Sequence, residues 1–457
     1  MLQRPNTCLG KNSERTQMKE LNILIVGHGC FPNMGSDAGI TWNWAWHLAE
    51  RNRVWVIAHG FARPLVEQYL HDHPRPNLQF IWVGPLGWWD PWKNPGPTKA
   101  RGLPLHYLLW RHAAVAAAKR LMASESIDIV HHVSWNSISA PPLLWRTGKP
   151  FVWGPIGGGH ILPWRFLTSI GRAALPELLR NLRVSIMPWT PSLRRTVART
   201  DLMLAANRES AAVLRRAGAG HVELLPDIGI PTELLQPRSP EQAAGPKLIV
   251  LWAGRLVRFK GLAIFLKVAK AVRTQDIRFL VAGWGRHEWV ERYVRRLGLK
   301  DRVEFLGHVP WGELQQRFAE ADLFVFTSLR DTFGTVNLEA LAKGCPVMCL
   351  NHQGVGTHLP DTVAIRVPVT APEAVVQAMA GHIDSVASDR ARLRRMSQAA
   401  YSFATTQQWN DRALLMEQLY RQVLARRAVT QTSSGGSAEP AIMLTAGTAK
   451  RGGGGGA

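Results

Sequence analysis

The feature that most constrains the fold is an alternation of short β-branched runs with longer helical stretches, which occurs twice along the chain. In the first half, strands are expected at 22–26, 54–57, 78–83, 127–130, 150–153 and 202–204. After a turn-rich stretch with five prolines at 226–246, more strands are expected at 248–252, 279–281, 303–306, 323–326 and 346–349. Strands that alternate with helices form βαβ units in a parallel sheet. The sequence therefore predicts an α/β chain of two Rossmann-like, doubly wound domains facing across a cleft.

The domain limits follow from this alternation. The segments expected are an N-terminal tail at 1–19, a first domain at 20–226, a linker at 227–246, a second domain at 247–408, a helix at 409–427 and a tail at 428–457. Two domains suit a chain of 457 residues, because one domain usually has about 150. The polar or Gly-rich composition of both tails predicts disorder. Whether helix 409–427 returns to the first domain stays open.

Cysteine usage and hydropathy indicate where the protein works. The four cysteines, at Cys8, Cys30, Cys345 and Cys349, show no CxxC spacing. We interpret them as packing thiols in a reducing compartment. No apolar run approaches the roughly 18–20 residues that a membrane span needs. We therefore expect a cytoplasmic protein with neither a secretion signal nor a transmembrane anchor.

The formal charge of +22 favours a polyanionic partner. Between Arg165 and Arg199 there are seven arginines and one acid, Glu177, interleaved with tryptophan, phenylalanine and leucine. Two interpretations of segment 164–199 stay open: a solvated basic helix pair, or a surface that docks on anionic lipid headgroups at the inner face of a membrane. No groove-reading helix or base-stacking motif accompanies the charge, so nucleic acid is not expected as a partner.

The segment from Asp331 to Glu339 has the pattern of a ligand site. It follows the buried strand at 323–326, and open α/β sheets bind ligands beyond the carboxyl ends of their strands. A helix that starts near Gly334 leaves the amides of Gly334, Thr335 and Val336 without internal acceptors, so they attract phosphate or sugar oxygens. Asp331 would lie on the loop and Glu339 inside the helix, each holding a different part of a nucleotide sugar.

Two cations follow the strand at 248–252. Arg255 and Lys260 flank a short loop just before an expected helix at Gly261. A guanidinium binds phosphate oxygens bidentately and an ammonium acts as a movable point charge, so the pair suits a diphosphate. Such a loop, taken alone, is usually solvated surface. Its combination with the 331–339 segment makes that interpretation less favourable.

These motifs together resemble a known family. The segments that carry the resemblance are 254–261, 282–285, 303–309 and 331–347, and more loosely Gly35 to Trp42 and Trp153 to Gly159. Their order and spacing are similar to those of the donor half of retaining GT-B glycosyltransferases of family four, of the bacterial polysaccharide-assembly type. The resemblance implies a transferase that moves a sugar, with retention, from a nucleoside-diphosphate donor to a glycan or lipid-linked acceptor.

The resemblance also implies residue roles. Arg255 and Lys260 would hold the donor diphosphate, Asp331 the sugar hydroxyls and Glu339 the ribose. Further donor contacts are expected at Gly254, Gly283, His308, Val309, Gly334, Thr335 and Val336. The family usually has glutamate where this chain has Asp331. The carboxylate here is shorter by about 1.5 Å, so the loop sits closer or the sugar is held differently.

The catalytic residue of the first domain is less well defined. Related enzymes often carry His-x-His at a strand end, whereas this chain has His131 and His132 followed by Val133. Alternation along a strand would point the two histidines to opposite faces. Either one is a candidate for the reaction, and a packed or hydrogen-bonded histidine is the alternative.

Glycine-rich loops of the first domain are further candidates. Gly35 and Gly39 suggest a loop arching over the cleft, although a plain turn between a strand and a helix fits equally well. Gly157 and Gly158 allow close approach of an acceptor, or meet an unusual backbone requirement.

No metal is implied, because the chain has no Asp-x-Asp and no His/Cys cluster with metal spacing. The nucleotide sugar is a co-substrate, and no other cofactor is expected. Two alternatives to a transferase stay open. One is a nucleotide-sugar epimerase or phosphorylase of GT-B-like fold. The other is a non-catalytic, basic protein that binds membranes or polyanions.

Overall fold

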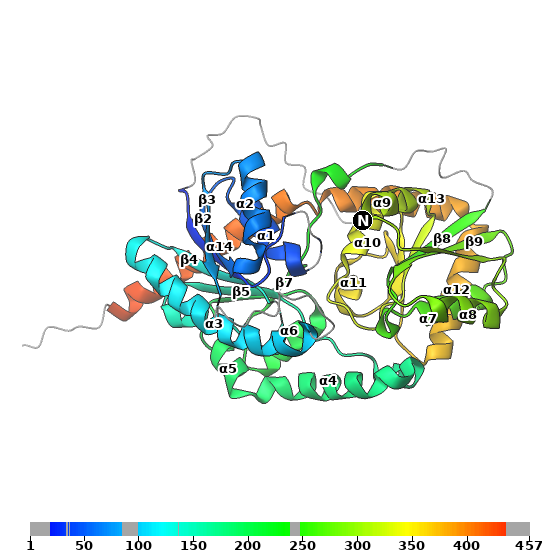
Figure 1. The fold of residues 1–457 in the computed structure, drawn as a ribbon, viewed down its shortest axis with the longest axis horizontal. Coiled ribbons are helices and arrows are strands. Elements are labelled where there is room, and N and C mark those ends of the chain that lie inside the picture. Colours follow the sequence, from blue (N-terminus) through cyan, green and yellow to red (C-terminus); the bar gives the residue numbers. More distant parts are fainter. Residues whose placement is uncertain are drawn as a thin grey trace, which may run out of the picture.

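The computed structural model describes residues 19–32, 35, 37–84, 99–135, 137–237 and 247–435. The expected tail at 1–19 lies outside this range except for its last residue, as do the tail beyond 435 and part of the linker, 238–246. The described chain forms two lobes, each built around a parallel sheet (Figure 1).

The first sheet has the strand order β3-β2-β1-β4-β5-β6-β7, and its pairs are all parallel. Its strands are β1 (Asn22–Gly27), β2 (Arg53–His59), β3 (Leu78–Val83), β4 (Ile129–Ser134), β5 (Phe151–Ile156), β6 (Leu202–Ala205) and β7 (Glu223–Leu224). Helices cover both faces, so strands such as β4 and β5 are buried along their whole length.

The second sheet has the order β10-β9-β8-β11-β12-β13, again with parallel pairs. Its strands are β8 (Leu248–Arg255), β9 (Ile277–Trp284), β10 (Val303–Gly307), β11 (Leu323–Phe326), β12 (Val347–Leu350) and β13 (Ala364–Val367). In both sheets the strand order reverses next to the first strand, β1 or β8. This is the doubly wound arrangement, which places ligands at the carboxyl ends of the strands. The predicted fold of two facing Rossmann-like domains is confirmed. The short edge strands β7 and β13 were not predicted.

The helices of the N-terminal domain are α1 (Asp37–Leu48), α2 (Arg63–Asp72), α3 (Lys99–Ser124), α4 (Ala174–Ile186), α5 (Pro191–Val197) and α6 (Arg208–Arg216). Those of the C-terminal part are α7 (Leu262–Ala271), α8 (Glu288–Leu297), α9 (Trp311–Glu320), α10 (Thr335–Ala342), α11 (Gln353–His358), α12 (Pro372–Ser388), α13 (Arg390–Thr405) and α14 (Trp409–Gly435). None of the described helices is both long and apolar enough to cross a membrane.

The last helix, α14, packs on the N-terminal domain. It lies against α1, and Tyr420 Oη is 2.6 Å from His131 Nδ1 in the core of that domain. Where the chain enters this helix, Ile230 of the linker exchanges backbone hydrogen bonds with Gln407 and Trp409. The helix runs to Gly435, so the expected boundary at 427 is corrected by eight residues.

A second crossing joins the two domains. Residues Leu162, Phe166 and Ile170 are buried in the same hydrophobic cluster as Leu248 and Val250 of β8. Helix α4 then returns along the lower edge of Figure 1 toward α5. Part of the first 226 residues thus contributes to the core of the C-terminal domain, which the sequence did not indicate.

Candidate functional site

The centre of the C-terminal site is an ion pair between Lys260 and Asp331. Lys260 follows β8 and Asp331 follows β11, and adjacent parallel strands bring the two loops together. The side chains are 17% and 18% exposed, so solvent reaches the pair but screens it only weakly. Asp331 Oδ1 also accepts a hydrogen bond from the amide of Thr332 at 3.0 Å. Lys260, which is predicted to bind the diphosphate, and Asp331, which is predicted to bind the sugar, are therefore direct neighbours.

Helix α10 starts immediately beyond this pair. Its N-cap, Gly334, has φ +87°, and a Cβ there would come within 2.8 Å of Phe326. Asn337 donates to the carbonyl oxygens of Phe333 and Gly334 and fixes the turn. The amides of Gly334, Thr335 and Val336 are then left at the open end of the helix, where they suit phosphate or sugar oxygens.

Glu339 lies one turn further into α10 and is 8% exposed. Trp311 Nε1 and Gln315 Nε2, both on α9, donate to its carboxylate at 3.4 and 3.2 Å. Burial raises the pKa of Glu339, and these two donors oppose the effect. The carboxylate is thus oriented by α9, a role that sequence spacing did not reveal.

The remaining predicted donor residues surround the same edge of the sheet. Arg255 is exposed at the end of β8, and His308 and Val309 follow β10. Gly254 and Gly283 are paired across β8 and β9. A Cβ on Gly283 would lie 2.6 Å from Leu256, so that glycine serves close packing.

The N-terminal domain contacts the site through the start of α6. Asn207 Nδ2 donates to the carbonyl of Thr332 at 3.1 Å, and Glu209 Oε1 accepts from the amide of Gln353 at 2.7 Å. Gln353 has φ +59°, which is uncommon for a residue other than glycine. The 331–335 loop is therefore held from both domains.

The two candidate histidines lie inside the N-terminal domain. His131 is fully buried, with Nε2 donating to the carbonyl of Gly154 at 2.7 Å and Nδ1 facing Tyr420 Oη. Burial lowers the pKa of His131 to about 4. Both ring nitrogens have partners, which favours the packed, hydrogen-bonded alternative for His131. His132 is 1% exposed, and its Nε2 lies 3.1 Å from the hydroxyl of Tyr107, which is also buried.

The sequence prediction missed His160, which follows Gly159 at the carboxyl side of β5. It is 5% exposed, its carbonyl accepts from Arg180 Nη1 at 2.8 Å, and its Nδ1 has no hydrogen-bond partner among the described atoms. Burial lowers its pKa well below the ordinary value, and Arg180, Arg330 and Lys260 act in the same direction. His160 thus lies in the cationic region between the domains. The glycine run before it was the only sequence signal.

The predicted glycine loops have different positions. A Cβ on Gly158, which has φ +81°, would meet Ser137 Oγ at 2.9 Å, and Gly157 forms a bridge with the same serine. These glycines therefore hold the loop after β4. Gly35 is exposed with open space around it, whereas Gly39 is buried within α1.

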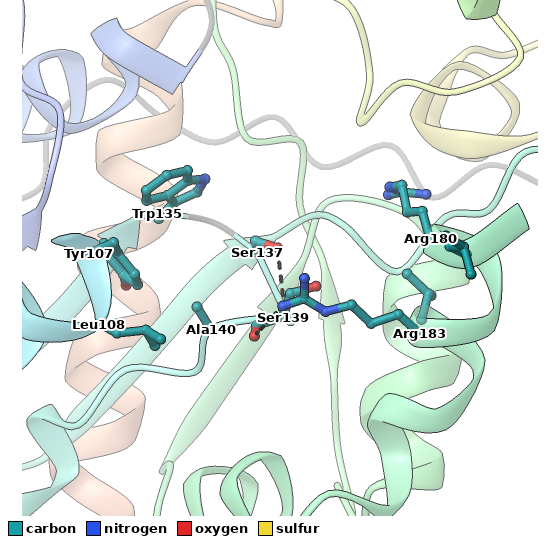
Figure 2. Close-up of a pocket in the computed structure, with 10 residues that line it drawn as sticks. Tyr107, Leu108, Trp135, Ser137, Ser139, Ala140, Arg180 and Arg183 are labelled. Atoms are coloured by element: carbon teal, nitrogen blue, oxygen red, sulfur yellow. Dashed lines mark hydrogen bonds between the residues drawn. The ribbon is translucent and has the colours of Figure 1, made fainter. Parts of the chain in front are cut away.

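A pocket of about 490 Å³ opens beside this loop (Figure 2). It is lined from α3 by Tyr107 and Leu108, from the loop after β4 by Trp135, Ser137, Ser139 and Ala140, and from α4 by Leu179, Arg180, Arg183 and Val184. Figure 2 shows Arg183 reaching across toward Ser139, whose carbonyl accepts from its Nη2 at 3.4 Å.

Helix α4 has an unusual distribution of side chains. Its inner face carries the buried Glu177, which pairs with Arg330 at 3.0 Å, and Asn181, which binds both backbone groups of Leu162. Its outer face carries a stripe of large apolar side chains that are 46–63% exposed: Leu175, Leu179, Leu182 and Ile186. Trp164 and Trp189 at either end are also exposed. Exposed apolar stripes mark interaction surfaces.

Three histidines of the N-terminal domain lie close together although they are distant in sequence. His28, His59 and His106 are buried, and one potential ligand atom from each lies within 4.8 Å of the others. Burial lowers the pKa of His28 to about 3, and the neighbouring histidines add to the shift. His59 Nδ1 accepts from the amide of Phe61 at 3.2 Å, which places the proton of the neutral ring on Nε2. That tautomer disfavours metal binding by His59 through Nε2.

Comparisons with known proteins agree with this geometry. Residues 237–403 match the model of the family described as glycosyl transferases group 1. This part of the chain is therefore similar to the glycosyl transferases group 1. The matched group 1 segment contains Arg255, Lys260, Asp331 and Glu339.

Relatives of the group 1 segment are found in several organisms. D-inositol 3-phosphate glycosyltransferase of Corynebacterium glutamicum is 30% identical over 195 residues, which cover 40% of this chain and 45% of the relative. The putative colanic acid biosynthesis glycosyltransferase WcaL of Salmonella typhimurium is 26% identical over 177 residues, covering 36% and 43%. Less than half of the length of either relative is matched.

Solved structures are similar over nearly the whole chain. Sucrose-phosphate synthase from Thermosynechococcus elongatus superposes with a TM-score of 0.60 at 20% identity, covering 89% of this chain and all of that one. WaaG, a glycosyltransferase involved in lipopolysaccharide biosynthesis, superposes with a TM-score of 0.54 at 14% identity, covering 88% and 99%. This likeness shows the fold alone, and it covers both domains.

Proposed function

We propose that this protein transfers a sugar from a nucleoside-diphosphate donor to a glycan or lipid-linked acceptor. The observation that carries the proposal is the meeting of Lys260 and Asp331 beneath the open end of α10, within the group 1 segment. A diphosphate placed there would be held by Arg255, Lys260 and the first amides of the helix. Asp331 and Glu339 would bind the sugar and the ribose.

The first test is donor binding and turnover. Purified protein is screened by thermal shift against UDP- and GDP-sugars, because a ligand at a hundred times its dissociation constant stabilises a protein by about 2.7 kcal/mol. Arg255→Ala and Lys260→Ala are expected to abolish turnover without loss of folding. The matched control is Lys267→Ala on α7, because Lys267 forms a surface ion pair with Glu373 of α12. Normal turnover by both site variants would exclude the proposal.

We propose further that the transfer retains the anomeric configuration. No carboxylate is assigned as a covalent nucleophile, so the departing phosphate would take the acceptor proton on the face from which it leaves. Closure of the two domains would exclude water from the reacting atoms. The anomeric coupling constant of the product by NMR distinguishes retention from inversion. Incubation of the donor without acceptor would reveal epimerisation instead.

We also propose that the reaction needs no metal, because cationic side chains neutralise the diphosphate. The proposal can be tested at one cluster of the described residues, His28, His59 and His106, whose potential metal-ligand atoms lie within 4.8 Å of one another. Dialysis against EDTA is expected to leave turnover unchanged. Metal independence would be contradicted if EDTA abolishes turnover and zinc restores it. The restoration by zinc should then fail in the His106→Gln variant.

For the cell, we propose a cytoplasmic enzyme docked on anionic lipid through segment 164–199. The exposed leucines of α4 would enter the headgroup region, and exposed arginines such as Arg194 and Arg195 would contact lipid phosphates. Flotation with phosphatidylglycerol vesicles is expected to weaken when both arginines become serine. The pair Arg295 and Arg296 on α8, also exposed, provides the matched control. Equal flotation of both double variants would remove segment 164–199 from the docking surface.

A further inference from the structure

The pocket beside α4 has two guanidinium groups and, among the residues that line it, no carboxylate. Arg183 bonds weakly to Ser139, while Arg180 is anchored by the carbonyl of His160. Burial lowers the pKa of Arg180 to about 10, Arg330 adds to this effect and Glu177 opposes it. Such a pocket favours an anion, and guanidinium groups match the geometry of phosphate.

The two helices that line the pocket, α3 and α4, both carry exposed leucines. Helix α3 presents Leu105, Leu108 and Leu109, and α4 presents the stripe that contains Leu179. Leu108 and Leu179 belong to both the lining and the exposed sets. At Leu108 and Leu179, apolar surface is therefore continuous from the pocket wall to the outside of the protein. A ligand that is anionic at one end and apolar at the other fits this arrangement.

The pocket also has a suitable position for an acceptor. Arg180 and Arg330 act electrostatically on the same His160 as Lys260 of the donor site. The pocket helix α4 also contacts the segment just before Asp331, because Glu177 pairs with Arg330 at 3.0 Å. Its volume of about 490 Å³ lies within the usual range of small-molecule sites. It accommodates a polar head, while a long chain must lie outside it.

We propose that the pocket binds the phosphate-bearing head of an amphiphilic acceptor, whose apolar chain lies along the leucines of α3 and α4. This inference rests on the proposed function and names the acceptor class. Arg183 contacts the phosphate directly, and Arg180 holds it on the side of the donor site. Trp135 and Tyr107 form the opposite wall, as Figure 2 shows.

The test is calorimetric binding of dodecyl phosphate, below its critical micelle concentration, to the full-length protein. Dodecyl maltoside and inorganic phosphate are the comparison probes, because each supplies only one half of the proposed ligand. Arg183→Gln should weaken binding of dodecyl phosphate by about 10- to 100-fold, the usual effect of losing a charge-assisted hydrogen bond. Arg295→Gln on α8 should leave it unchanged. Ala140→Trp, which fills the pocket, should abolish it while the thermal transition remains cooperative.

Equally tight binding of dodecyl maltoside, or of inorganic phosphate, would overturn the proposal. So would an Arg183→Gln variant no weaker than Arg295→Gln. UDP and GDP are titrated into the same preparations. If the protein binds nucleotide but not dodecyl phosphate, the acceptor assignment is overturned and the proposed transfer stays intact. If it binds dodecyl phosphate but not nucleotide, the proposed transfer is overturned and the pocket remains a site for an amphiphilic phosphate.

Discussion

The ion pair of Lys260 and Asp331 leads to a prediction in which two neighbouring substitutions have opposite effects on nucleotide affinity. Before the donor binds, the ammonium is shared with a carboxylate that would repel a diphosphate. Both side chains are mostly buried, so solvent screens their charges little. One charge-assisted contact contributes about 1.5–3 kcal/mol. Lys260→Ala should therefore weaken UDP or GDP binding by about 10- to 150-fold.

Asp331→Asn removes the repulsion and releases the ammonium for the diphosphate. Nucleotide affinity is expected to rise by up to about tenfold, or about 1.4 kcal/mol, while kcat falls because the contact to the sugar is lost. Calorimetric titration of UDP and GDP, beside initial rates with the preferred nucleotide sugar, separates the two effects.

Asp331→Glu, which supplies the side chain usual in the resembling family, tests the length of the contact. A changed preference between donor sugars is expected, with nucleotide affinity close to that of the unaltered protein. If Asp331→Asn weakens nucleotide binding as much as Lys260→Ala does, the carboxylate supports the nucleotide and the reasoning from repulsion is refuted.

Three further predictions concern stability. Tyr420→Phe removes the hydroxyl that faces His131 and should lower the free energy of unfolding in urea titrations by about 1–3 kcal/mol. Tyr401→Phe, at a half-buried tyrosine, is the control. An unchanged urea midpoint for Tyr420→Phe would contradict the contact. Because the pKa of His131 falls from 6.5 to about 4 on folding, the unfolded chain binds more protons between these pH values. The free energy of unfolding should therefore fall by about 3 kcal/mol as the pH is lowered through this window. If His131→Asn does not flatten the pH dependence measured by calorimetric melting, His131 is excluded as its source. Gly334→Ala forces a side chain onto Phe326 at positive φ and should cost about 1–3 kcal/mol together with nucleotide affinity, whereas Gly298→Ala, at φ +71° with open space around it, should cost stability alone.

Much of the fold was predictable because burial on both faces of a parallel sheet leaves continuous apolar runs. Apart from β7 and β13, the strands of both sheets were visible in this way, including β8 and β11, whose ends carry Lys260 and Asp331. Strand β7, with only two residues, is too short to give such a signal. The crossing of Leu162, Phe166 and Ile170 into the C-terminal core was equally hidden, because an apolar side chain does not specify which core it joins.

The C-terminal site was more predictable than the N-terminal one for a physical reason. Its predicted residues, Arg255, Lys260 and the 331–339 segment, follow strand ends directly, so sequence order alone places them at one edge of the sheet. In the N-terminal domain, the histidines of β4 are inside the sheet, and only packing decided that Tyr420 from α14 would occupy His131. His160 needed the positions of three cations from other segments before it could be noticed.

The sequence by itself determined two doubly wound domains, their order, and a cationic and acidic pair at the carboxyl edge of the second sheet. These features depend on local hydropathy and on the chirality of βαβ units, which act over short stretches of chain. Only the tertiary structure decided which face of α4 is exposed, that its leucines meet those of α3 at a pocket, and which histidines are sealed in the core. Those outcomes depend on contacts between segments far apart in the chain, and no local pattern encodes them.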